Sequence, residues 1–100
     1  MKIILICNLG MSSGLMGEKL NDAAAQSGIE AEVDAIPMNE IEELDLSGVD
    51  CVLISPQVRY MKNDVEKMAN GSCAVLVMDS IEFGLMQADK IMARIVEAVK

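Results

Sequence analysis

Residues 3–13 read IILICNLGMSS, a short apolar run that passes directly into a loop containing glycine and serine. The run shows no polar alternation, which is typical of a strand covered on both faces in a parallel sheet. Ser12 or Ser13 can cap a helix that runs to about Ser27, where Gly28 supplies a left-handed terminating residue. This strand, loop and helix together predict the start of a β–α–β crossover.

Three further stretches have the character of strands. Residues 51–54 and 74–78 are apolar runs that suit strands covered on both faces, like the first. Residues 30–36 alternate apolar with acidic side chains, which predicts an edge strand with one face in water. Between them, residues 38–44 are expected to form a short helical turn.

Two more helices follow from the spacing of apolar side chains. Pro56 is expected to start a helix that ends at Asn70-Gly71, and residues 87–100 form the last helix. The apolar face of the Pro56 helix is predicted to carry Val58, Met61, Val65 and Met68. The alternating order of strands and helices predicts an α/β fold: a four-stranded parallel sheet of order 2-1-3-4 with helices on both faces.

This topology nominates a site before any motif is considered. In a sheet of order 2-1-3-4 the chain reverses direction between strands 1 and 3, which opens a crevice at their carboxyl ends. Three segments meet there: the loop after Ile6, residues 55–57, and Asp79 with Ser80. We therefore expect the chemistry at the loop that begins with Cys7.

The composition narrows the function classes. One hundred residues, 52% of them hydrophobic, are expected to form a single domain over residues 1–100. The net charge of −8 argues against nucleic acid and anionic membranes as partners. The apolar run at residues 3–7 is too short for a signal peptide or a membrane span. Three cysteines without a C-x-x-C pair suggest free thiols in a reducing compartment, so we expect a cytoplasmic protein. No histidine is present, and we expect no metal and no cofactor.

The loop at Cys7 combines features that suit phosphate chemistry. Backbone N–H groups at a helix N-terminus converge on an anion, and Gly10 lets the backbone turn inward. Ser12 and Ser13 add hydroxyl donors, so one loop can both favour a thiolate and hold a phosphoryl group attached to it. A cysteine after an apolar strand is also often a small buried hydrophobe, which is how we interpret Cys51 and Cys73.

Three motifs on separate loops carry a resemblance to a known family. Cys7-x-x-Gly10-Met11-Ser12-Ser13 resembles the phosphorylation site of the enzyme IIB proteins of the bacterial sugar phosphotransferase system (PTS), lactose/cellobiose/chitobiose type. The segment ISPQVRYM at residues 54–61 is similar to the family's Gly-Pro-Gln-(Ile/Val)-x-Tyr-Met. DSIEFG at residues 79–84 is similar to its Ile-Asp-x-x-x-Tyr-Gly, with Phe83 in the usual tyrosine position.

The resemblance implies a function as a protein-phosphohistidine–sugar phosphotransferase. Cys7 would be the nucleophile that takes a phosphoryl group from a phosphohistidine on enzyme IIA. It would pass the group to a sugar, a β-linked disaccharide such as cellobiose, chitobiose or lactose, moved by membrane enzyme IIC. The implied phosphate-binding loop comprises Asn8, Leu9, Gly10, Met11, Ser12 and Ser13. The supporting or partner-facing residues would be Gln57, Tyr60, Met61 and Asp79. Two of them have an alternative role: Gln57 as a residue at the start of its helix, and Asp79 as the cap of the turn after the strand at residues 74–78.

Three other functions remain open at this point. A low-molecular-weight phosphatase uses a similar loop with Cys-x5-Arg, but here position 13 is serine and the chain's arginines are Arg59 and Arg94, the latter expected on a solvated helix face. Lacking that arginine, the loop suits a carrier better than a hydrolase. A regulatory domain that senses phosphorylation with the same fold is the second alternative. A redox protein is the third, although no resolving cysteine lies near Cys7 in the sequence.

Overall fold

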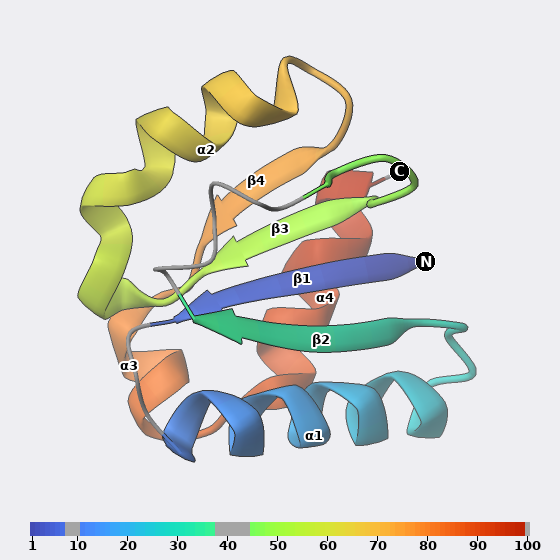
Figure 1. Cartoon of the computed structure of the whole chain (residues 1–100). Helices are drawn as coiled ribbons and strands as arrows, with labels where there is room; N and C mark the ends of the chain where they lie inside the picture. The colour runs from blue at the N-terminus through green and yellow to red at the C-terminus, as the bar shows by residue number, and fades with distance from the viewer. Residues whose placement is uncertain (8–10, 38–44, 100) are drawn as a thin grey trace.

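The computed structural model describes residues 1–7, 11–37 and 45–99, with the backbone alone in residues 11–14. Four strands form one parallel sheet: β1 (Lys2–Cys7), β2 (Glu32–Pro37), β3 (Cys51–Ile54) and β4 (Ala74–Val77). Their order across the sheet is β2-β1-β3-β4, which confirms the predicted topology (Figure 1). All four strands end at the same edge, so β1, with β2 on one side and β3 on the other, delivers Cys7 to the switch point.

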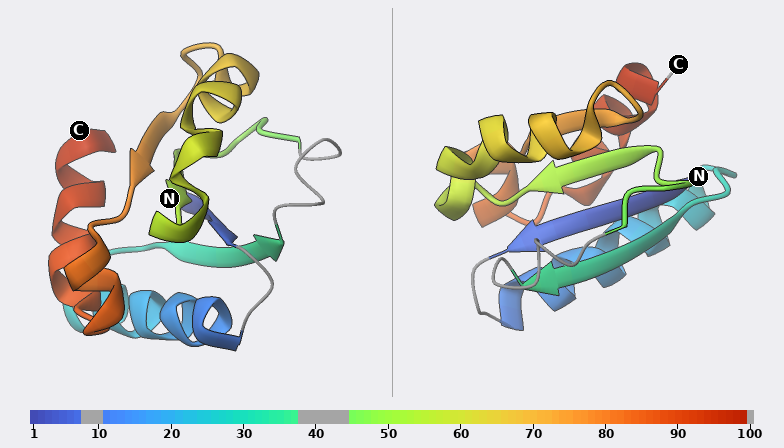
Figure 2. Two further views of the ribbon diagram at one scale, coloured as in Figure 1. Left: turned by 90° about the vertical axis from the view of Figure 1, so that its left-hand side faces the viewer. Right: turned by 45° about the horizontal axis from the view of Figure 1, so that its top comes forward.

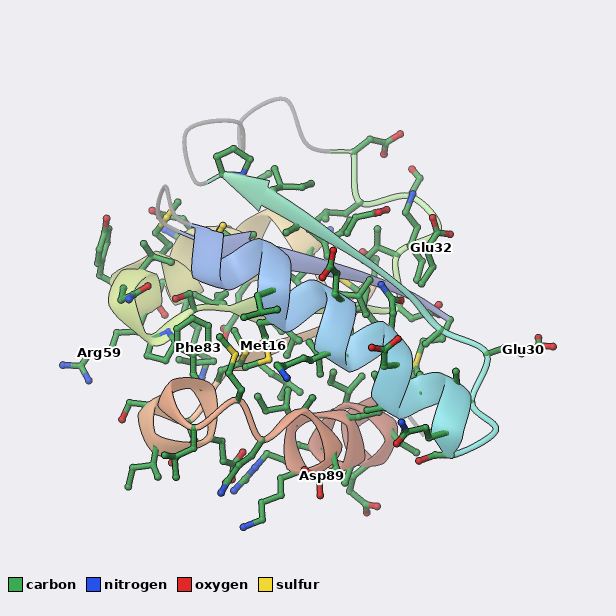
Figure 3. All side chains as sticks on the ribbon, turned by 90° about the horizontal axis from the view of Figure 1, so that it is seen from below. Met16, Glu30, Glu32, Arg59, Phe83 and Asp89 are labelled. Atoms are coloured by element: carbon green, nitrogen blue, oxygen red, sulfur yellow. The ribbon has the colours of Figure 1, made fainter. Side chains whose placement is uncertain are left out.

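Helices cover both faces of the sheet, as predicted. On one face lie α1 (Met11–Gln26), α3 (Ser80–Gly84) and α4 (Ala88–Val99), and on the other lie the 3-10 helix η2 (Pro56–Met61) and α2 (Lys62–Ala69) (Figures 1 and 2). Alternation along β1 divides the core, because Ile3 and Leu5 pack under α1 and α4 while Ile4 and Ile6 pack under η2 and α2. From below, Met16 and Phe83 lie close together in the first of these layers, whereas Arg59 points outward (Figure 3).

The two ends of α1 differ in how well they were predicted. Gly28 has φ +71°, and the N–H groups of Gly28 and Ile29 donate to the carbonyls of Ala25 and Ala24, which is the Schellman ending predicted for glycine. The expected cap at Ser12 or Ser13 is wrong. The helix begins at Met11, so both serines lie inside its first turn. An N-cap residue precedes the first helical residue and has non-helical dihedrals, so neither serine is the N-cap.

The segment from Pro56 to Asn70 is two helices and not one. Val58 has non-helical dihedrals (φ −120°, ψ 27°), and η2 gives way to α2 at Lys62. The buried face therefore follows 3-10 spacing from Val58 to Met61 and α-helical spacing afterwards. As a result Ala69 is buried in place of the predicted Met68, which is 38% exposed. The ending at Asn70, with a left-handed φ of 48°, is confirmed.

The two outer strands are less buried than the inner pair. In β2, Val33 is buried between exposed Glu32 and Asp34, as expected for an edge strand, but Ala35 is exposed. All four residues of β4 are half-buried, so the prediction of full cover on both faces is wrong, because β4 is the opposite edge of the sheet. The turn expected over residues 38–44 lies outside the described residues.

The last part of the chain contains one unpredicted helix. Asp79 caps the five-residue α3, accepting from the N–H groups of Ile81 and Glu82. The following α4 confirms the helix predicted from about residue 87, with Ile91 and Ile95 buried. Together β4, α3 and α4 bring Asp79 to the edge where β1 ends.

Candidate functional site

Cys7 is the last residue of β1, whose carboxyl end lies at the same edge of the sheet as the start of α1 (Figure 2). It is 6% exposed, and its thiol donates a hydrogen bond to the Ile36 carbonyl, with Sγ and O 3.6 Å apart. Ile36 lies in β2, whose Pro37 is the register partner of Cys7. The sulfur is thus held between the ends of two neighbouring strands.

The predicted phosphate loop is described only in part. Asn8, Leu9 and Gly10 lie outside the described residues. Met11, Ser12 and Ser13 form the start of α1, at the same edge as the end of β1 (Figure 1). The N-terminus of this 16-residue helix carries a partial positive charge and N–H groups without helical partners, which favours an anion near Cys7.

The residues after β3 reach the same edge. Gln57 is exposed in the first turn of η2, and its side-chain oxygen accepts a hydrogen bond from the Ser55 hydroxyl at 3.0 Å. Ser55 itself is fully buried, and its N–H donates to the Ile6 carbonyl at 2.9 Å. The structure therefore brings Gln57 to the same edge as Cys7, and it adds Ser55, which the sequence reasoning did not single out as a site residue.

The other nominated residues take different positions along this edge. Tyr60 is 68% exposed, whereas Met61 is 8% exposed and packs in the core beneath η2. Asp79 is exposed, and the carboxylate is committed to capping α3. Met61 and Asp79 therefore have structural contacts of their own, in the core and at the start of α3. Phe83 is 8% exposed and packs in the core, where a phenol hydroxyl would need a polar partner.

Arg94 is exposed on α4, as the sequence predicts, and it also forms an ion pair that the sequence did not predict. Its guanidinium donates to both carboxylate oxygens of Glu82, with Nη2 to Oε2 at 2.8 Å and Nε to Oε1 at 3.0 Å. These hydrogen bonds raise the pKa of Arg94, and Glu82 is buried to 9% exposure. The ion pair joins α3 to α4 through two residues that are twelve positions apart in the sequence. One of the chain's two arginines therefore has a structural partner.

The remaining cysteines have the character of core residues. Cys51 is fully buried at the start of β3, and burial raises the pKa of its thiol to about 12. Cys73 is half-buried, and burial raises the pKa of its thiol as well. Both thiols are therefore protonated at neutral pH and poor nucleophiles. All three cysteines are free of disulfides.

The described residues contain neither a metal-binding cluster nor a membrane-spanning helix. Within residues 1–7, 11–37 and 45–99, no cluster of three or more cysteine and acidic side chains is placed to hold a metal ion. In the same part of the chain, the helices are too short or too polar to cross a membrane.

Sequence comparisons place this arrangement among known proteins. The family described as "PTS system, Lactose/Cellobiose specific IIB subunit" matches residues 2–94. The oligo-beta-mannoside-specific EIIB component of Bacillus subtilis (strain 168) is 34% identical over 90 residues, covering 89% of this chain and 86% of that protein. The galactose-specific EIIB component of Lactococcus lactis subsp. cremoris is 36% identical over 99 residues, covering 91% of this chain and 89% of that protein.

Solved structures agree with the topology. The lactose-specific IIB domain from Streptococcus pneumoniae superposes with a TM-score of 0.86 over the whole chain and 98% of that domain; at 14% identity this likeness concerns the fold alone. The cellobiose-specific IIB component from Borrelia burgdorferi is 26% identical, with a TM-score of 0.75 over 99% of this chain and 91% of that protein.

Proposed function

The chain belongs to the lactose/cellobiose-specific IIB family of the sugar phosphotransferase system, and from this premise we propose that Cys7 is the residue that carries its phosphoryl group. Members of the family are phosphotransferases, so the reaction class is fixed and the open questions are the residue, the partners and the sugar. The observation that carries the proposal is the position of Cys7, at the carboxyl end of the central strand and next to the N-terminus of α1.

The proposed reaction has two transfers. In the first, the sulfur of Cys7 attacks the phosphorus of a phosphohistidine on enzyme IIA in line; the S–P bond forms, the P–N bond breaks, and the thiol proton passes to the released imidazole nitrogen. In the second, a sugar hydroxyl oxygen attacks the same phosphorus; the O–P bond forms, the S–P bond breaks, and the hydroxyl proton passes to the released sulfur. The amides of residues 8–13, with the Ser12 and Ser13 hydroxyls, receive the phosphoryl oxygens in both steps.

The same site suits a carrier better than a phosphatase. Position 13 is serine, and Arg94 is committed to Glu82, while Arg59 is exposed on η2. A cation fixed on the phosphoryl oxygens is typically worth about 10²-fold in rate, and it speeds attack by water as readily as attack by a sugar. A site held by neutral N–H and hydroxyl donors is expected to keep the phosphocysteine until the acceptor arrives.

The surface around Cys7 suits a protein partner. Four exposed large apolar side chains among the described residues lie near the start of α1, in η2, or in and just after α3: Leu15, Tyr60, Ile81 and Leu85. An exposed apolar rim of this kind is typical of a protein interface. We propose that enzyme IIA docks on this rim, that enzyme IIC uses it in turn, and that residues 1–100 act as one domain in the cytoplasm. A β-linked disaccharide is the proposed sugar.

The test is to locate the phosphoryl group. The protein is incubated with phosphorylated IIA and digested under conditions that preserve phosphocysteine, and the labelled peptide is sequenced by mass spectrometry. The phosphoryl group is expected on the peptide that contains Cys7, with Cys7→Ala unlabelled and Cys51→Ala labelled like the wild type. Full labelling of Cys7→Ala would contradict the proposal.

A further inference from the structure

Ser55 lies beside Cys7 at the end of the neighbouring strand. Its N–H donates to the Ile6 carbonyl at 2.9 Å, which continues the β1–β3 ladder one residue beyond the last register pair. Cys7 and Ser55 are therefore cross-strand neighbours, in strands about 4.8 Å apart. By alternation along β1, Cys7 lies on the same face of the sheet as Leu5, whereas Ser55 follows the last residue of β3 and turns its hydroxyl to Gln57 in η2.

The Ser55 hydroxyl has an unusual partner for its position. Ser55 stands at the N-cap of η2 with extended dihedrals (φ −60°, ψ 143°), where serine normally accepts from a helix N–H group. Here the side chain makes no cap hydrogen bond, and Oγ donates to the Gln57 side-chain oxygen at 3.0 Å. A fully buried hydroxyl requires a partner, and this one uses the amide of an exposed residue. Helix capping therefore does not explain the serine.

This hydrogen bond fixes the orientation of the Gln57 amide. An amide carries its oxygen and its NH2 group on opposite sides of one carbon, so an oxygen held toward Ser55 turns both N–H donors away from it. Gln57 is exposed at the edge where the phosphoryl group on Cys7 must lie. Without the serine hydroxyl, an exposed amide rotates about its last bond and presents its oxygen as often as its N–H groups.

We propose that Ser55 is a positioning residue for phosphoryl transfer, which acts by aiming the Gln57 N–H donors at the phosphoryl oxygens. The proposal rests on the proposed function of Cys7. The bond changes are those already given: the S–P bond forms, the P–N bond breaks, and the thiol proton goes to the imidazole. Gln57 donates hydrogen bonds to the phosphoryl oxygens throughout and exchanges no proton. Ser55 touches only Gln57 in this scheme, so its effect disappears when Gln57 is absent.

Rates of phosphoryl transfer from phosphorylated IIA test the proposal. Ser55→Ala and Gln57→Ala are each expected to lower kcat about tenfold with KM unchanged, and the double variant is expected to lose no more than either single one. Gln57→Glu keeps an oxygen for Ser55 but removes both donors and adds a like charge, so it is expected to fall below Gln57→Ala. Gln57 is exposed, so its variants should fold.

Ser72→Ala is the matched control. The Ser72 hydroxyl also makes a hydrogen bond, to the Ala69 carbonyl at 2.6 Å, but between α2 and the start of β4, so transfer should stay at the wild-type rate. The NMR signals of the Gln57 side-chain amide give a readout beyond activity: they are expected to move on phosphorylation of the wild type and not of Ser55→Ala.

Three outcomes overturn the proposal. One is a wild-type kcat in folded Ser55→Ala, and another is a full Ser55→Ala effect in the Gln57→Ala background. The third is a wild-type rate in Gln57→Glu. Each of these leaves the role of Cys7 intact, because wild-type protein is still labelled there. Failure of the proposed function itself is a different result, namely wild-type protein that takes no phosphoryl group on Cys7.

Discussion

The carboxyl edge and the amino edge of the sheet each carry a buried cysteine, and the two thiols differ in where their strands lead. Cys7 ends β1, beside the N-terminus of α1, with its thiol hydrogen-bonded to the Ile36 carbonyl. Cys51 begins β3, is fully buried, and has a thiol pKa raised to about 12 by that burial. Position along the strand, and not residue type, therefore separates the candidate nucleophile from the core residue.

The polar groups of the two edges are also used differently. At the amino edge, the Asp50 carboxylate accepts from the Lys2 N–H at 2.8 Å, and the Asp45 carboxylate accepts from the Ser47 N–H at 2.9 Å. The latter bond lowers the pKa of Asp45. Asp45, Ser47 and Asp50 line a groove of about 550 Å³, and its acidic side chains disfavour a phosphate ligand. At the carboxyl edge, the exposed Gln57 carries a neutral amide instead, whose oxygen accepts from the Ser55 hydroxyl.

Replacing each of these two cysteines with alanine gives the largest expected difference in activity. Cys7→Ala should abolish sugar phosphorylation in a system reconstituted with IIA and IIC, because no other described thiol reaches the carboxyl edge. Cys51→Ala should keep the wild-type rate while lowering the free energy of unfolding by about 1–2 kcal/mol, because it leaves a small cavity. Sugar phosphate formation and urea unfolding measure the two effects. An inactive but folded Cys51→Ala protein would remove the distinction between the edges.

A charge placed on the apolar rim should weaken docking without unfolding the protein. Ile81 is 68% exposed in the first turn of α3, where an acidic residue suits the helix dipole. Ile81→Asp is expected to raise KM for phosphorylated IIA about tenfold, equivalent to about 1.4 kcal/mol, at similar kcat. Met68→Asp, on α2 and 38% exposed, is the control with the same charge change and should leave KM unaltered. Equal effects from both variants would mean that the rim is not the docking surface.

The buried thiol of Cys51 should make stability fall at alkaline pH. Its pKa in the folded state is about 12, above the 9.0 of an exposed thiol, so between these values the folded state keeps a proton that the unfolded state loses. This contribution is complete below pH 9 and is lost as pH rises toward 12. Between neutral and alkaline pH, the urea midpoint of unfolding should therefore fall further in the wild type than in Cys51→Ala. Parallel slopes would contradict the assignment.

A pair of glycines gives the smallest contrast. Gly71, before β4 at the amino edge, has φ +79°, whereas Gly84 in α3 has no positive φ; a Cβ at either position meets nothing within 4 Å. Gly71→Ala should cost about 1 kcal/mol of stability from backbone strain alone. Gly84→Ala should be neutral or gain about 0.5 kcal/mol from higher helix propensity. Thermal unfolding of the two variants measures the difference, and a stabilised Gly71→Ala would argue against the left-handed turn.

Much of the fold was predictable because apolar runs and helix-terminating residues are visible in short stretches of the sequence. The run at residues 51–54 has the same bounds as β3, and Gly28 ends α1 as its chemistry requires. The five-residue α3 was missed because it is too short to show helical periodicity. Its signal was the spacing of Asp79 and Glu82, in which the N-cap residue precedes an acidic residue by three positions.

The position of Cys7 where β1 ends was predictable, but the side-chain contacts around it were not. A cysteine at the end of an apolar strand, before glycine and serine, indicates a site from sequence alone. The hydrogen bond from Ser55 to Gln57 and the ion pair of Glu82 with Arg94 depend on how side chains turn after folding, which neither spacing nor propensity encodes. The exposure of Arg94 was predictable, but its pairing with Glu82 was not.

A single-turnover chase tests the central claim most directly. Protein phosphorylated by IIA is separated from the donor and mixed with membrane vesicles that contain IIC and the sugar, and phosphate on Cys7 and sugar phosphate are followed together. We predict that the phosphocysteine disappears at the rate at which sugar phosphate forms, with little free phosphate released. Sugar phosphate that forms while Cys7 stays fully phosphorylated, or phosphate lost only to water, would contradict the role of Cys7 as a carrier.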